Sequence, residues 1–422
     1  MCSYARKSDS ECRFPDSVEL DPYLVALTRS MAAHQDLPLK LNERRLSSEK
    51  MAHHFKVVPR TVIGPSAWDR FAQESSEAWL FHTSRWQAVA GTGKDRSFGL
   101  VNGSGILRAL ITLHSEPIPK IRLVPLRGIY NGRSGLARAA GMAQSEKAEL
   151  DVAAVRAIQH IGRCSGALLV SWELPTMAPG PDVPATSILT RFGFEIRSVP
   201  AKVVDLTQPE AALWKDYRKG CKSTIKKAQR EGVCVWCARD VADVECFSAL
   251  HAETMRSVGA RPRPAGYFTR LWNTLSPAGH CEVLLARLAS GTPVAGIMTM
   301  NWKSATYYHA AGSAQEHLDA GGNTLLVHEA ILRSRARGDQ TFHLGPTPRR
   351  EQVDEKTYLV GRFKNQFGGL EVPWRTASLF LWPGLATARR VARSLQQALK
   401  DKKNVELTEM KLAESKAGMD QT

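Results

Sequence analysis

Two distant parts of this 422-residue sequence resemble each other, and this repeat constrains the fold more than any other feature. Residues 98–115 and residues 284–302 both read as a strand, a glycine-containing turn and a second strand, with alternating apolar residues. Each is followed by a similar ending, at 189–200 and at 360–373, where an Arg-Phe pair precedes a second Phe, a nearby Gly and a Glu before a Pro. A repeat with so long a period predicts two copies of one α/β domain.

The repeat predicts a first domain over 56–200 and a second over 201–385. The pattern is clearer in the second, where a mixed sheet with helices on both faces is the packing that the order of elements predicts. Asn323 is expected to cap the helix that stops at Gly338. The elements expected in the second domain are a helix over 213–232, a strand over 233–240, helices over 243–259 and 267–275, the hairpin over 284–302, a strand over 305–313, a helix over 323–338 and a strand over 341–345.

The two ends of the chain differ from the repeat. Residues 1–55 are polar with weak periodicity and predict a loosely ordered extension, and Met51 is an alternative start of the protein. Residues 386–422 predict a basic amphipathic helix with a frayed end, after the apolar stretch 378–383. We expect this helix either to dock on the second domain or to rest on an anionic membrane face.

The sequence favours a cytoplasmic protein, with a peripheral position at the inner membrane through that helix as an alternative. No apolar run approaches the roughly 18 residues of a membrane span, and the N-terminus has no secretory h-region. The 8 cysteines are scattered, which favours reduced thiols over a disulfide framework. Cys234 and Cys237 have the spacing of a metal pair, but strand geometry puts them on opposite faces and no second pair follows. We therefore predict no metal site.

Basic residues outnumber acidic ones, 57 to 41, which gives a formal net charge of +16. A surplus of this size favours a polyanionic partner, such as nucleic acid, a nucleotide phosphate or an anionic membrane face. It is concentrated in the helix expected over 213–232, which predicts a phosphate-binding rim or, alternatively, an ordinary solvated face. The basic residues of this helix are Lys215, Arg218, Lys219, Lys222, Lys226, Lys227 and Arg230.

A turn between an expected strand and an expected helix is a second candidate site. Gly321, Gly322 and Asn323 lie there, where free backbone N–H groups at the helix start could meet a pyrophosphate or an oxyanion. An ordinary helix entry has the same pattern.

Two further groups of residues are candidates for binding and catalysis. Phe363 and Lys364 lie in a segment that reads as a strand, where the lysine is either a surface residue or the partner of an oxyanion. Arg263, Tyr267 and Tyr308 either clamp a sugar phosphate or pack a proline-rich loop.

Taken in order along the chain, these motifs resemble the FemABX family of peptidyltransferases and the wider group of tandem GNAT-like acyltransferases, over roughly 57–380. The motifs that carry the resemblance are Ile225-Lys-Lys-Ala228 with Gly232, His251-Ala-Glu-Thr254, Gly291-Thr-Pro-Val-Ala-Gly296, Tyr307 to Gly312, Phe342 to Gly345, and Phe363-Lys364 with Phe367-Gly368. The resemblance implies a mixed α/β fold of two tandem GNAT-like domains, with the catalytic motifs in the second and a helical C-terminal tail.

The resemblance also implies an activity. Members with known chemistry move an aminoacyl group from charged tRNA to an amine of a peptidoglycan precursor. Phe363 and Lys364 match the pair at the reaction centre, and Arg263, Tyr267 and Tyr308 match residues that bind the phosphate and sugar of the precursor. The expected protein is therefore an N-acyltransferase whose acceptor is a phosphate-linked cell-wall or polysaccharide precursor.

The sequence departs from the family in two places. Asn131 stands where an acidic residue is the proposed base, and an amide cannot take a proton. The loop from Leu318 to Asn323 keeps the glycines of an acyl-CoA loop, but the usual basic or amide residue is missing or is shifted to Gln315. The donor stays open between aminoacyl-tRNA and acyl-CoA, with no tightly bound cofactor expected.

Two alternatives to aminoacyl transfer remain. They are an acetyl-CoA-dependent N-acetyltransferase of an amino sugar and a non-catalytic RNA-binding module. The residues expected at the donor are Gly321, Gly322, Asn323, Lys222, Lys226 and Lys227.

Overall fold

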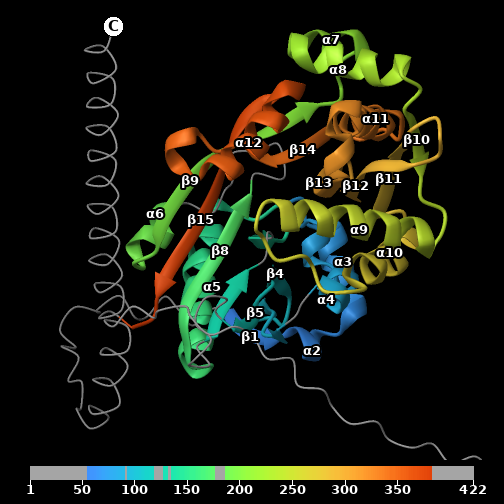
Figure 1. Cartoon of the computed structure of the whole chain (residues 1–422). Helices are drawn as coiled ribbons and strands as arrows, with labels where there is room; N and C mark the ends of the chain where they lie inside the picture. Colours follow the sequence, from blue (N-terminus) through green and yellow to red (C-terminus); the bar gives the residue numbers. More distant parts are fainter. Residues whose placement is uncertain (1–54, 91–92, 118–126, 132–134, 176–185, 383–422) are drawn as a thin grey trace, which may run out of the picture. The chain divides into compact units, whose positions relative to one another are not determined.

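An 11-stranded mixed sheet joins the two halves of the chain in the computed structural model (Figure 1). The structure describes residues 55–90, 93–117, 127–131, 135–175 and 186–382, all within one compact unit. The expected extension over 1–54 and the expected tail helix therefore lie outside the described residues. Along the sheet the strands are β10 (Cys234–Cys237), β11 (Cys281–Arg287), β12 (Pro293–Trp302), β13 (Ala305–Ser313), β14 (Thr341–Pro346), β9 (Glu195–Asp205), β15 (Leu370–Phe380), β8 (Ala167–Pro175), β6 (Arg127–Asn131), β5 (His114–Pro117) and β2 (Lys94–Asp95).

A smaller sheet belongs to the first half. It has the order β1 (Phe55–Pro59), β3 (Phe98–Asn102), β4 (Leu107–Ile111) and β7 (Leu136–Arg138). Both hairpins expected from the repeat are present, as β3–β4 and as β11–β12. They lie in different sheets, because β3 pairs with β1 whereas β11 pairs with β10.

The internal repeat is visible as two parallel crossovers. In the first half β6 and β8 pair in parallel and are joined through α5 (Gln144–Cys164). In the second half β13 and β14 pair in parallel and are joined through α11 (Gly322–Ala336). This arrangement confirms the expected mixed α/β fold of two tandem GNAT-like halves.

The two halves exchange their last strands. β9, from the first half, pairs with β14 of the second, and β15, from the second half, pairs with β8 of the first. β9 and β15 also pair with each other, and Pro200 lies directly opposite Pro373 in their register. These prolines end the two copies of the repeated sequence, so the repeats meet at their equivalent residues. The expected domain border at 200/201 falls inside β9.

The remaining helices of the described residues lie between these strands. In the first half they are α2 (Arg60–Ile63), α3 (Pro65–Glu74), the 3-10 helix η2 (Leu80–His82), α4 (Ser84–Ala90) and α6 (Thr186–Arg191). In the second half they are α7 (Glu210–Asp216), α8 (Lys219–Arg230), α9 (Val241–Ser257), α10 (Tyr267–Leu275), η3 (Ser276–Ala278), η4 (Gln315–Ala320), η5 (Arg350–Gln352), α12 (Glu355–Lys364) and η6 (Asn365–Phe367). No helix among the described residues is both long and apolar enough to span a membrane.

Three local predictions are wrong. The single helix expected over 213–232 is broken into α7 and α8, because Tyr217 turns inward, is buried, and packs edge-on against Phe367. Asn323 is not the cap of α11. Gly321 occupies that position at a φ of 72°, a left-handed conformation that a side chain disfavours.

The third wrong prediction concerns Phe363 and Lys364. They lie in the last turn of α12 and not in a strand. α12 begins where the Asp354 carboxylate accepts a hydrogen bond from the backbone N–H of Thr357. An acidic residue at this position is a typical helix start. The apolar residues that follow it resemble a strand, which is why the sequence did not predict the helix.

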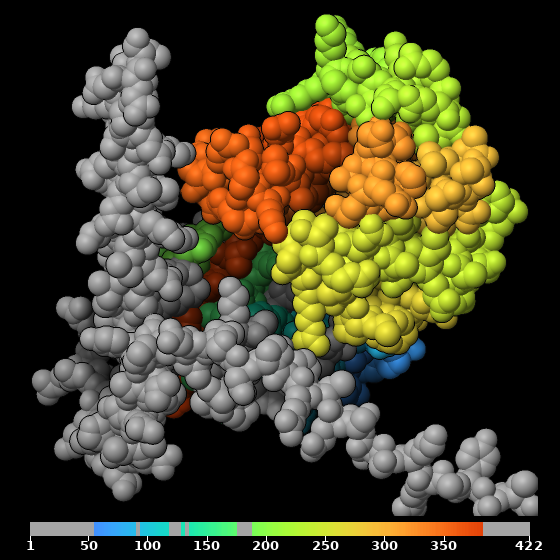
Figure 2. All heavy atoms as spheres, in the orientation of Figure 1, coloured from blue at the N-terminus to red at the C-terminus, as the bar shows by residue number. Residues whose placement is uncertain are grey.

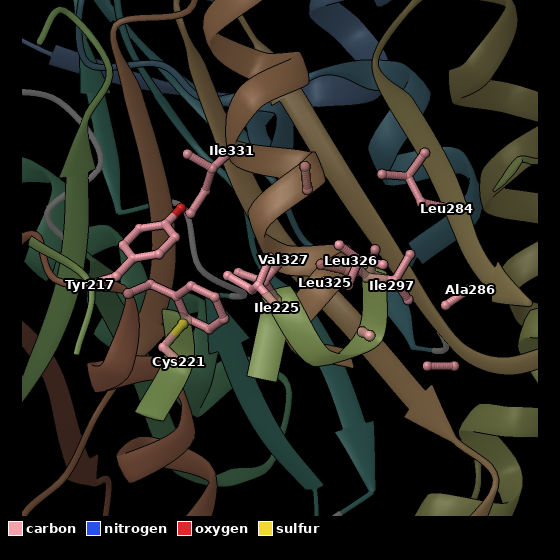
Figure 3. Close-up of a cluster of buried hydrophobic side chains, with 14 of the residues drawn as sticks. Tyr217, Cys221, Ile225, Leu284, Ala286, Ile297, Leu325, Leu326, Val327 and Ile331 are labelled. Carbon is pink, nitrogen blue, oxygen red and sulfur yellow. The ribbon is translucent and has the colours of Figure 1, made fainter. Parts of the chain in front are cut away.

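Two buried clusters cover opposite faces of the second-half sheet. One joins α8 and α11 to the sheet, and Figure 3 shows Ile225 of α8 beside Leu325 and Val327 of α11. The other joins α9 and α10 to the opposite face, with Phe247, Phe268 and Leu271 at its centre. The strands between these layers, β12 and β13 above all, are therefore held on both sides.

Buried histidines should make stability depend on pH. Burial lowers the pKa of His82 and of His343 from 6.5 to about 4. Between those values the unfolded chain binds a proton at each site that the folded protein does not, so the free energy of unfolding falls as pH falls. We expect a loss of about 1 kcal/mol per histidine between pH 7 and pH 5.5, measured by urea unfolding. In a His343→Gln variant the free energy of unfolding should fall less between pH 7 and pH 5.5. An equal fall would contradict the lowered pKa of His343.

Candidate active site

The parallel pair β13 and β14 separates part-way along its length. Its ladder covers Ala305–Tyr307 against Thr341–His343, and in the described chain the rest of β13 pairs with β12 and the end of β14 with β9. β13 carries a bulge beyond Tyr308, and β14 carries one between His343 and Gly345. Ligands of open α/β sheets bind where the carboxyl ends of neighbouring parallel strands diverge. This opening is therefore the candidate site.

Lys364 reaches this opening from the last turn of α12. Its Nζ lies 5.1 Å from the centre of the Tyr308 ring. A Cβ on Gly345, at the end of β14, would stand 3.5 Å from both Lys364 Nζ and the Tyr307 hydroxyl. The ammonium group and the phenol thus face the same point, at a glycine whose φ of 81° disfavours a side chain.

A second lysine holds the other end of α12. The Nζ of Lys356 donates a hydrogen bond to the backbone oxygen of Val258, just past α9, at 2.9 Å. In Figure 2 the orange surface of α12 meets the yellow surface of the end of α9. The start of the helix that carries Lys364 is therefore tied to the end of α9.

Tyr308 lies with Lys364 and not with Tyr267. Tyr308 packs against the cluster that contains α8 and α11, whereas Tyr267 belongs to the cluster on the opposite face of the sheet. Burial, with a smaller effect of Tyr307, raises the pKa of Tyr308 well above its usual range. Its ring is therefore a neutral surface beneath the ammonium group, which favours a cation–π contact.

Arg263 and Tyr267 form a separate pair at the start of α10. The Arg263 guanidinium lies 5.1 Å from the centre of the Tyr267 ring. The Tyr267 hydroxyl is 3.5 Å from Nε2 of His309, which follows Tyr308 in β13. The bulge turns His309 toward Trp86 and Tyr267. The structure therefore brings Arg263 and Tyr267 together and links them, through His309, to the strand of Tyr308.

In the expected donor loop, other residues of the protein occupy the space beside the two glycines. A Cβ on Gly321 would stand 2.7 Å from Thr224 Cγ2 of α8, and one on Gly322 would stand 3.0 Å from Val294. Asn323 donates through Nδ2 to Ser313 Oγ at 2.8 Å. These residues let α8 and the sheet approach α11 closely, so packing accounts for both glycines.

The lysines of α8 differ in how they are used. Lys222 donates to the Lys215 backbone oxygen at 2.8 Å, and Lys227 donates to that of Asp319 at 3.0 Å. Lys226 is exposed and has no hydrogen bond or ion pair in the described chain. Among Lys222, Lys226 and Lys227, the lysines expected at the donor, Lys226 is thus the most available to a phosphate.

Other residues of the site were missed by the sequence reading. Tyr307, His309 and Gly345 lie inside the motifs that carried the resemblance, but the sequence does not show which way each points. Asn131 ends β6 opposite Trp172, so the position of the expected base lies on a first-half strand. No cluster of three or more metal-binding side chains occurs in the part of the chain that the structure describes.

Comparison with known proteins identifies a domain family for part of the chain and a solved structure with the same fold. Residues 215–356 match the acetyltransferase (GNAT) domain family. The crystal structure of FemX superposes with a TM-score of 0.60 at 16% identity, over 79% of this chain and 99% of FemX. No curated protein matches the sequence.

Two more distant structures align over similar lengths. One is L-PGS from Bacillus licheniformis, with a TM-score of 0.47 at 13% identity, over 74% of this chain and 91% of that one. The other is a tandem GNAT protein from the clavulanic acid biosynthesis pathway, with a TM-score of 0.47 at 13% identity, over 78% and 99%.

Residues 215–356 thus form an acetyltransferase (GNAT) domain. The chain as a whole shares the fold of FemX.

Proposed function

We propose that this protein transfers an acyl or aminoacyl group to the amine of a phosphate-linked cell-wall or polysaccharide precursor. The observation that carries the proposal is the position of Lys364, whose ammonium group faces the opening between β13 and β14 beside Tyr307 and Tyr308. A fixed cation at such a point is suited to a developing oxyanion.

The chemistry assigns each group a role. The amine attacks the acyl carbonyl, and Lys364 stabilises the oxygen of the tetrahedral intermediate. As the new C–N bond is complete, the bond to the donor's oxygen or sulfur breaks, and the amine's proton passes to the leaving group or to solvent. Arg263 and Tyr267 would hold the acceptor's phosphate through charge-assisted hydrogen bonds.

Charged tRNA is the donor that the surface of α8 favours. Since packing fills the glycine loop, the phosphate contacts would fall on exposed lysines such as Lys226. Acyl-CoA is the second candidate, because the matched domain family consists of acetyltransferases. A cytoplasmic site of action at the inner membrane face would suit a lipid-linked acceptor.

Donor binding tests this choice. Titrating the purified protein with aminoacyl-tRNA and with acetyl-CoA, each at low and at physiological salt, should give tRNA binding that weakens steeply with salt. Transfer to a nucleotide-linked muramyl peptide is then followed by mass spectrometry. Saturable acetyl-CoA binding with no tRNA binding would overturn the tRNA donor. RNA binding without any transfer would point to the non-catalytic module.

A single lysine should report on the tRNA contact. Lys226→Ala should weaken tRNA binding several-fold and reduce the slope of log affinity against log salt by about 0.7–0.9, the share of one phosphate contact. Lys94→Ala is the matched control, because Lys94 is also exposed but lies on β2 at the other edge of the sheet. Equal effects of the two changes would mean that α8 has no special part in binding.

A further inference from the structure

Two polar atoms beside Lys364 are buried without a hydrogen-bond partner in the described structure. They are Oγ1 of Thr347, a residue that is 2% exposed, and Oδ1 of Asn365. Buried hydroxyl and amide groups nearly always have a partner, because an unpaired one loses its bonds to water and gains nothing. Among the atoms of the described residues that share this property, these two lie beside Lys364, where a bound substrate would supply the missing partner.

Both residues lie where the end of β14 meets the last turn of α12. The backbone N–H of Thr347 donates to the Pro200 oxygen at 2.7 Å, which fixes the chain just past β14. A Cβ on Gly361 would stand 3.1 Å from Thr347 Cα, and one turn later Lys364 Nζ reaches the Gly345 position. Strand end and helix therefore run alongside each other.

Asn365 continues the same side of the helix. It follows Gly361 by four residues and keeps a helical backbone, with φ of −63° and ψ of −12°. Residues four apart on a helix share a face. Asn365 thus belongs to the side of α12 that lies against the end of β14.

We infer that Thr347 and Asn365 bind the attacking amine of the acceptor. A neutral amine has two N–H groups and one lone pair, and the Thr347 hydroxyl and the Asn365 carbonyl oxygen can each accept one N–H. Bonds to both N–H groups leave the lone pair directed at the carbonyl whose oxygen Lys364 faces. Both residues are substrate-contacting residues of the site in the proposed function, on which this inference rests.

The chain offers a matched pair of variants. Thr347→Val removes the hydroxyl and keeps the shape of the side chain. Thr306→Val does the same to a buried threonine whose hydroxyl is bonded to Asp339 Oδ2, at 2.6 Å. Thermal unfolding should show no loss for Thr347→Val, with a rise of about 1–2 °C, and a clear loss for Thr306→Val.

The kinetic arm decides the role in binding. With the wild-type protein transferring to the muramyl peptide, Thr347→Val should lower kcat/KM for the acceptor about 10-fold or more and leave donor affinity unchanged. Asn365→Asp should lower it too, because a carboxylate repels the reaction's oxyanion. Normal kinetics in both variants would overturn the inference and leave the proposed function standing.

The unfolding arm decides the inference where the wild-type protein transfers to no tested amine. If Thr347→Val raises the melting temperature, the Thr347 hydroxyl has no hydrogen bond within the protein, which supports a role in binding a ligand. A melting temperature lowered as in Thr306→Val shows that the hydroxyl has a bond within the protein, and it overturns the inference.

Discussion

Lys364→Ala should lower kcat for acyl transfer about 10²–10³-fold, because it removes the positive charge that faces the developing oxyanion. The ammonium group is placed by α12, which is tied to Val258 at one end and meets Gly345 at the other. Since the carbonyl of the donor carries little charge before attack, donor affinity should change far less than kcat. Steady-state kinetics with saturating donor and acceptor measure the effect.

Two companion variants separate charge from packing. Arg362→Ala removes an exposed cation from the same helix, and it should retain near wild-type kcat. Lys364→Met keeps the length of the side chain without its charge, so it should be as slow as the alanine variant. A fast methionine variant would show that Lys364 only supports the Tyr308 ring.

The sequence predicted the repeat but not the exchange of strands. Alternating residues around a turn are a local signal, so both hairpins were found. The partner of a strand is a long-range property, and β9 and β15 have no feature in their own residues that selects β14 or β8. The Pro200–Pro373 pairing makes sense of the repeated endings only once both strands are in place.

The sequence predicted candidate residues but not how they are arranged. The resemblance pointed to Lys364, Tyr308, Arg263 and Tyr267, and the structure places the first two apart from the others. The bulge after Tyr308 decides on which face of the sheet the neighbouring side chains lie. A bulge inserts one extra residue into a strand, and the alternation of apolar and polar residues in the sequence does not show where it lies.

The part played by the two glycines of the loop could not be predicted for a related reason. A glycine that admits a ligand and a glycine that admits a helix look the same in a sequence. Only the neighbours of Gly321, Thr224 above all, show which is present.

Gly312→Ala should lower the free energy of unfolding by about 3 kcal/mol, because a Cβ there meets backbone and cannot be accommodated by a rotamer change. It would stand 2.3 Å from the His251 backbone nitrogen and 2.5 Å from the Leu250 carbonyl carbon, both in α9. Hydrogen bonds on either side resist the required shift. Nδ1 of His251 donates to the Ala311 oxygen at 2.9 Å, and the Ser313 N–H donates to Thr254 Oγ1 at 2.8 Å.

Gly296→Ala is the sharpest control, since Gly296 lies opposite Gly312 in the register of β12 and β13. Its Cβ would meet the ring of Phe247 at 2.7 Å, a side chain that can move, so the loss should be smaller. Gly103→Ala, in open space, should be nearly neutral. Urea unfolding should therefore rank the three losses as Gly312, then Gly296, then Gly103. Since β13 also carries Tyr307 and Tyr308, displacement of α9 from Gly312 should also reduce acyl transfer. A Gly312→Ala protein that is stable and active would show that α9 is free to move away from the strand.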